Sequence, residues 1–131
     1  MKGIGIGAVA LAALLFATVW WQGFAAPPGL LFGTPTAEVE AAYCLAVAER
    51  ISEITGGRGD GRLERHLDEQ VDFWRPRAGP RPGMGRIALA RDSSATDVNE
   101  GAHLHLAVQD CAFRAVNFYG HRFAEFEGPG N

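Results

Sequence analysis

Residues 36–55 read TAEVEAAYCLAVAERISEIT, and this stretch indicates an α-helix. Thr36 is a good N-cap, and two glutamates in the first turn favour the positive end of the helix dipole. Apolar residues recur at helical spacing along one stripe, which consists of Val39, Tyr43, Val47, Ile51 and Ile54. Gly56-Gly57 then stops the pattern. The stretch predicts an amphipathic helix and, with it, a helical fold.

Two more helical patterns follow along the chain. Residues 60–75 begin at Asp60, an N-cap residue, and end before Pro76, because proline disfavours a helical conformation at the residue before it. Residues 96–119 have apolar side chains on two opposite sides, and such a helix is buried by several neighbours or holds a partner. We therefore expect an all-α domain of three helices within residues 36–127. The first two helices should be antiparallel neighbours, since their connection is short.

The N-terminal stretch from Gly3 to Phe24 reads GIGIGAVALAALLFATVWWQGF and carries no charge. As a helix it is about 33 Å long, against roughly 30 Å for the hydrocarbon core of a bilayer. Trp20-Trp21 stands where a membrane helix places interfacial aromatic residues, and Lys2 favours an N-terminus inside. Residues 1–26 are therefore predicted to be a transmembrane anchor, followed by a linker over 27–35. The alternative is a signal peptide cut between Gly23 and Pro28.

The two cysteines of the chain, Cys44 and Cys111, lie in the first and the third predicted helix. An exported domain folds in an oxidising compartment, where two cysteines on facing helices indicate a disulfide. The alternative is a pair of buried thiols. No Cys-x-x-Cys motif points to redox chemistry.

Residues 75–91 carry five arginines and no acidic residue. Their proline and glycine content predicts a loop over 75–95, in which Ile87-Ala88-Leu89 forms at most a short ordered element. Beside a tryptophan, such a loop is a candidate contact to anionic lipid or to an acidic protein surface. The candidate residues here are Trp74, Arg75, Arg77, Arg81 and Arg86, and on the last helix Leu106 and Phe113. The alternative for the arginines is a solvated loop that balances the acids of the preceding helix.

The sequence has no specific catalytic or cofactor motif. His103 and His105 are two residues apart and point in nearly opposite directions on a helix, so they do not close on one metal ion. His103, Asp110, Asn117 and His121 spread over several turns and are expected to form a solvated face rather than a catalytic centre. The formal net charge of −3 gives no signal for nucleic acid. We expect no cofactor, no metal and no enzymatic activity.

These observations favour a small accessory or structural subunit of a larger membrane complex. The predicted topology is a single pass through a bacterial-type inner membrane, with the helical domain in the periplasm. The alternative is a secreted or periplasmic helical binding module, similar to a chaperone or an inhibitor, whose signal peptide has been removed. A metal-binding sensor that uses His103, His105 or His66 is a third, weaker hypothesis.

Overall fold

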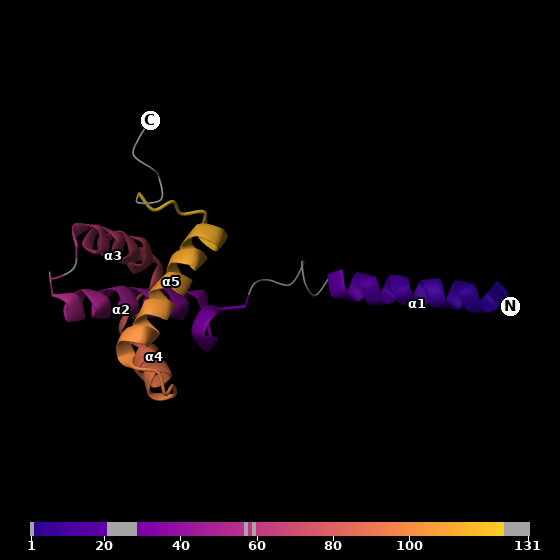
Figure 1. The fold of residues 1–131 in the computed structure, drawn as a ribbon, viewed down its shortest axis with the longest axis horizontal. Helices are drawn as coiled ribbons and strands as arrows, with labels where there is room; N and C mark the ends of the chain where they lie inside the picture. The colour runs from indigo at the N-terminus through magenta and orange to yellow at the C-terminus, as the bar shows by residue number, and fades with distance from the viewer. Residues whose placement is uncertain (1, 21–28, 57, 59, 125–131) are drawn as a thin grey trace.

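The computed structural model of the chain describes residues 2–20, 29–56, 58 and 60–124. These residues form an all-α structure, without a strand in the described part. Figure 1 shows α1 (Lys2–Trp20) apart from the other four helices. Helices α2 (Ala37–Thr55), α3 (Gly61–Trp74), α4 (Gly83–Ser94) and α5 (Glu100–Tyr119) gather into one domain.

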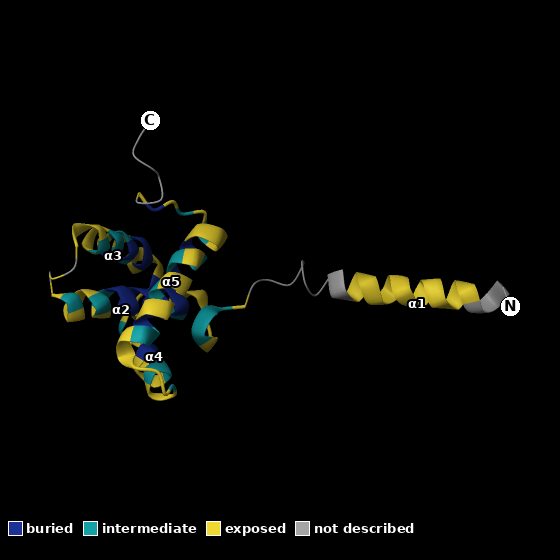
Figure 2. Cartoon of the chain, viewed as in Figure 1, coloured by how far each residue is buried: buried dark blue, intermediate teal, exposed yellow. Residues whose placement is uncertain are grey.

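Helix α2 is the central element of the domain. Thr36 caps its N-terminus by accepting a hydrogen bond from the backbone N–H of Val39, and Gly56 ends it in the left-handed conformation. All residues from Glu40 to Ala48 are buried, which gives the dark blue segment of α2 in Figure 2. A helix that is buried on every side needs neighbours on every side, and α3, α4 and α5 all contact α2.

Helix α3 lies beside α2 and runs back along it (Figure 1). Asp60 caps its first turn through the N–H of Leu63. Its buried side includes Leu67, Phe73 and Trp74, and the Trp74 indole donates a hydrogen bond to the Gln70 side chain at 3.1 Å. Helices α2, α3 and α5 all lie within the ranges where the sequence predicted helices. Helix α5 begins later than Thr96, because Asn99 supplies the N-cap.

The prediction of a loop over 75–95 is wrong for most of that range, and the described part of the domain has four α-helices rather than the three predicted. Residues Arg75–Arg77 form a 3₁₀ turn, η3, and Gly83–Ser94 form helix α4. Pro82 precedes the helix with a φ of −62°, which suits a helix start. Ala88 and Leu89 are buried in a cluster with Tyr43 and Val47 of α2, so tertiary packing outweighs the weak helix propensity of Gly83-Met84-Gly85.

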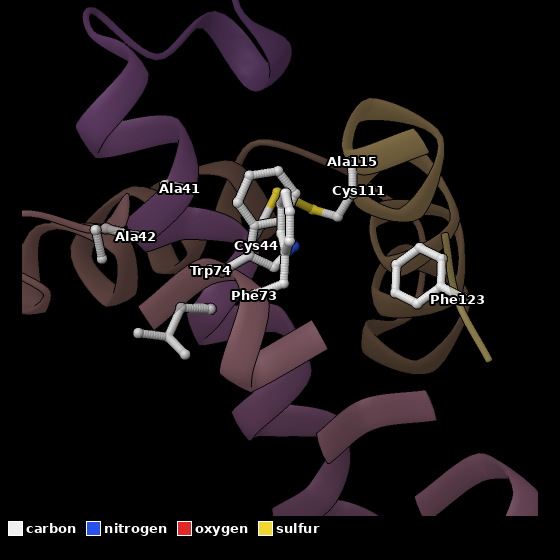
Figure 3. Packing of buried hydrophobic residues seen from close by; sticks show 10 residues of the cluster. Ala41, Ala42, Cys44, Phe73, Trp74, Cys111, Ala115 and Phe123 are labelled. Carbon is white, nitrogen blue, oxygen red and sulfur yellow. A yellow bond between two sulfur atoms is a disulfide. The ribbon is translucent and has the colours of Figure 1, made fainter. Parts of the chain in front are cut away.

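The predicted disulfide is confirmed. Cys44 of α2 and Cys111 of α5 are bonded, with their Cα atoms 5.6 Å apart. Both residues are fully buried in the cluster that contains Phe73, Trp74 and Phe123. Figure 3 shows the bridge between the two helices, next to the Trp74 ring. The bridge fixes α5 across the middle of α2.

The segment before α2 also belongs to the domain. Leu31–Gly33 form a 3₁₀ turn, η2, and the ring of Phe32 stacks on Tyr43 with centroids 4.0 Å apart. The linker predicted over 27–35 is therefore in contact with the domain from Leu31 onward. Residues 27 and 28, and residues 125–127 at the predicted end of the domain, lie outside the described residues.

Helix α1 is 19 residues long, and every side chain described in it, from Gly5 to Thr18, is exposed. Within the part of the chain that the structure describes, no helix combines the length and the apolarity needed to cross a membrane. Trp21 and the predicted cleavage region lie outside the described residues, and the Trp20 side chain is likewise not described.

Gly85 is the closest point between α4 and α2. A Cβ added there would lie 1.9 Å from the carbonyl oxygen of Ala42, which is backbone and cannot rotate away. We predict that Gly85→Ala lowers the free energy of unfolding by about 1–3 kcal/mol or more, as overpacking does. Gly83→Ala in the same helix is the control, because its nearest atom is the end of the Arg86 side chain at 3.9 Å. Thermal unfolding followed by circular dichroism should show the loss for Gly85→Ala alone.

The disulfide closes a loop with a sequence separation of 67. We predict that reduction lowers the free energy of unfolding by roughly 4 kcal/mol, since the open chain regains conformational entropy. Urea unfolding with and without reductant measures the difference, and a thiol assay on unreduced protein should find no free thiol. Two titratable thiols in the unreduced protein would contradict the bridge.

Candidate functional site

The outer face of α5 presents several large apolar side chains on the surface of the domain. Its inner face is buried through Leu104, Ala107, Cys111 and Ala115. On the opposite side, Leu106 and Phe113 are 57% and 64% exposed, and the neighbouring Val116 is 38% exposed. Leu106 and Phe113 are seven residues apart, so they stand two turns apart on one face. Soluble domains seldom expose large apolar side chains in a contiguous row without an interaction to match.

A groove of about 760 Å³ continues this face toward α3. Its apolar lining comes from Val108, Ala112, Phe113, Val116 and Phe123. Its polar lining comes from His66 of α3, Gln109 of α5, and His121 with Arg122 in the segment after α5. An apolar groove with a few polar groups at its rim is typical of binding sites.

The segment after α5 forms one wall of the groove. Gly120 ends the helix in the left-handed conformation, with a φ of 68°, and turns the chain back toward α3. Glu69 of α3 holds the returning segment: it lies 3.1 Å from the His121 Nε2 atom and accepts hydrogen bonds from the backbone N–H of Ala124. Phe123 is thereby fully buried, against His66 and His121.

A buried ion pair holds α5 to α2 below this surface. The Arg114 Nε atom donates to the Glu40 Oε1 atom at 2.8 Å, and the Glu40 side chain has no solvent exposure. The second carboxylate oxygen accepts the backbone N–H of Leu31 at 2.6 Å. The Arg114 guanidinium also lies over the Phe118 ring, 4.3 Å from its centroid. One carboxylate therefore joins α2, α5 and the segment that leads toward α1.

A second polar cluster joins α2, α4 and α5. The Tyr43 hydroxyl donates to the Asp92 carboxylate, and the His103 Nε2 atom is 3.3 Å from both of these groups. Burial, followed by the hydrogen bond to Asp92, raises the pKa of Tyr43 above its ordinary value of 10.0. The hydroxyl therefore remains a neutral donor, which suits a structural cross-link rather than a nucleophile.

The arginines predicted as contacts divide into two groups. Arg75 lies 3.7 Å from Glu49, and Arg77 donates to the carbonyl of Phe73 while its guanidinium stacks 3.8 Å from the centre of that ring. Arg81 and Arg86 are exposed, as is Arg91. Trp74 has no exposed surface, so it is not available to lipid or to a partner, in contrast to the prediction. Its position in the stripe of α3 places it in the core.

The histidines also differ from expectation. His103 and His121 pair with Asp92 and Glu69, so the face predicted to be solvated is open mainly at Asp110 and Asn117. His105 is exposed and His66 lies at the groove. No three histidine, cysteine, aspartate or glutamate side chains among the described residues converge as metal ligands would.

Sequence reasoning identified Leu106 and Phe113 but missed the groove beside them. The groove depends on the return of Phe123 and on the latch at Glu69, which join segments 55 residues apart. Glu40 was interpreted only as a charge at the helix start. Its place four residues before the buried Cys44, on the same helix face, was the available signal.

Comparison of the chain with known protein families, with curated proteins and with solved structures finds no match. The arrangement of the site is therefore the basis for a functional hypothesis.

The buried pair of Glu40 and Arg114 can be tested against an exposed one. We predict that Glu40→Ala lowers the free energy of unfolding by about 3–5 kcal/mol, because it leaves a buried guanidinium without its counter-charge. Glu53→Ala, which removes one of the two exposed carboxylate partners of Arg50, should cost less than about 1 kcal/mol. Urea unfolding measures both. Equal effects of the two substitutions would show that the buried pair contributes no more to the free energy of unfolding than the exposed pair does.

Proposed function

We propose that the protein is a non-enzymatic accessory subunit of a larger membrane assembly, and that it binds a protein partner through the outer face of α5. The exposed row of Leu106, Phe113 and Val116, continuous with the groove, is the observation that carries this proposal. Apolar and aromatic side chains in the centre of a patch with a polar rim are characteristic of protein interfaces. The Glu40–Arg114 pair and the disulfide hold α5 in a fixed position below that surface.

Anchoring in the membrane is part of the same proposal. It is supported by the uncharged sequence from Gly3 to Phe24 and by the exposure of large apolar side chains along α1. Ile6, Val9, Leu14 and Phe16 are each at least 65% exposed, so α1 buries little of its apolar surface in the domain. In a bilayer the same surface meets hydrocarbon. The helical domain then faces the periplasm, where the Cys44–Cys111 disulfide is stable.

A secreted or periplasmic binding module is the second candidate. The size of the groove favours it, because about 760 Å³ falls in the range of pockets that hold small molecules. In that case the N-terminal segment is a signal peptide. The intact mass of the mature protein separates the two: loss of about 25 residues selects the secreted module, and the full mass selects the anchored subunit.

The interface is tested by paired substitutions on the full chain, extracted in mild detergent. We expect the protein to migrate as a discrete assembly larger than its own 14.0 kDa, and Leu106→Ser with Phe113→Ser to release it. Each buried apolar side chain at an interface contributes about 1.5–3 kcal/mol, so the double substitution weakens binding more than 100-fold. Ile54→Ser with Val98→Ser is the control, since these residues are each 50% exposed but lie outside the groove.

Two results would contradict the proposal. One is a wild-type protein that leaves the membrane as a lone species. The other is an assembly that persists in the Leu106→Ser/Phe113→Ser variant while circular dichroism shows that the variant is folded.

A further inference from the structure

Helix α4 presents a second outward face, which combines apolar and cationic side chains. Ile87 is 64% exposed and Met84 is 42% exposed. On a helical projection Arg86 and Arg91 lie on either side of Ile87, while Gly85, Ala88 and Leu89 point to α2. A helix face with apolar residues between arginines is characteristic of segments that lie at a bilayer surface.

The arginines of this face are not engaged elsewhere. Among the described residues, the guanidinium groups of Arg81, Arg86 and Arg91 form no hydrogen bond or ion pair, whereas those of Arg75, Arg77 and Arg114 do. The acidic groups nearby come mostly from other elements. Asp92 is taken by Tyr43 and His103, and Glu38 borders the same hollow as Arg81. Arg86 borders a hollow that also holds Glu49, Glu53, Glu100 and Arg50. Helix α4 itself carries Arg86 and Arg91 and a single acid, Asp92, which is already engaged.

The tether keeps this face near the bilayer if α1 is inserted. Eleven chain steps join Trp20 to Leu31, which span at most about 40 Å. Phe32 packs against both buried clusters of the domain, the one that holds Ala88 and Leu89 of α4 and the one that holds Trp74 and Cys111. The short tether therefore keeps the whole domain, α4 included, at a high effective concentration of membrane surface.

We propose that the outer face of α4 rests on the headgroup layer of an anionic bilayer, with Arg86 and Arg91 on lipid phosphates and Ile87 at the acyl boundary. The proposal rests on the membrane anchoring argued above. A bilayer fits this face better than an acidic protein, because Ile87 projects from a convex helix and lines none of the described hollows. An arginine side chain near an anionic lipid surface is attracted to it, and this attraction declines with distance over about one Debye length.

The test uses the full chain in lipid nanodiscs that contain phosphatidylcholine alone or mixed with phosphatidylglycerol. A nitroxide at Ala90→Cys reports on the α4 face, and one at Ser52→Cys on α2 is the control; both sites are exposed. The native cysteines are bonded to each other, so the new thiol is the labelling site. Accessibility to oxygen and to a water-soluble nickel complex measures contact with lipid.

We expect the label at position 90 to gain oxygen accessibility and lose nickel accessibility in anionic discs, while the label at position 52 does not change. Arg86→Gln with Arg91→Gln should shift the ratio of lipid-contacting to free label about 30-fold toward the free form. Arg62→Gln with Arg65→Gln, two exposed arginines of α3, is the matched control and should have no effect.

The possible failures are distinct. A chain that does not enter the discs overturns the anchoring and this inference with it. A chain that enters but shows equal accessibility at position 90 in both lipid mixtures overturns this inference alone. A label at position 90 that stays accessible to nickel in anionic discs but is protected in native membranes identifies an acidic protein surface, and also overturns it.

Discussion

The backbone contact between Gly85 and Ala42 is the constraint on which the domain depends. It brings α4 against a helix whose residues from Glu40 to Ala48 are buried, and no side chain at position 85 fits in the space. Alanines continue the same close approach, at positions 41, 42, 46 and 48 of α2 and at positions 88, 107 and 115 of its neighbours. Small residues let helices pack at short distances but contribute little apolar area each, so the interior needs other sources of stability.

The disulfide and the Glu40–Arg114 pair add stability to a domain whose interior contains many small residues. Both join α2 to α5, and each connects residues more than 60 positions apart. The bridge restricts the unfolded chain, while the ion pair acts on the folded state, because a buried carboxylate with two donors tolerates few other arrangements. Glu40 also accepts the N–H of Leu31, so the position of the tether and the position of α5 depend on the same carboxylate.

Local sequence signals predicted the parts of the fold that depend on local chemistry. Thr36 and Asp60 act as helix caps, and the two cysteines on separate stripes pair as compartment and helix geometry suggested. Helix α4 could not be predicted in this way, because the glycines and prolines of its sequence indicate a loop. The helix is stabilised by the packing of Gly85 against α2, which is a tertiary contact. The groove required the return of Phe123, and the burial of Trp74 required knowing how α3 faces the disulfide. Each of these depends on contacts that only the folded chain makes.

Large apolar side chains are exposed on two surfaces of the domain, the outer face of α5 and the outer face of α4. Leu106 and Phe113 lie on the side of α5 away from its buried residues, and Ile87 lies on the side of α4 away from its own, so all three are exposed. Exposed apolar side chains of this kind contribute little to the stability of the fold, and in soluble domains contiguous patches of them are characteristic of interaction sites. The two faces differ in charge: that of α5 opens onto a groove with few charges, whereas that of α4 lies between unpaired arginines. The proposed protein partner on α5 and the proposed anionic membrane on α4 each match the chemistry of the face that would contact them.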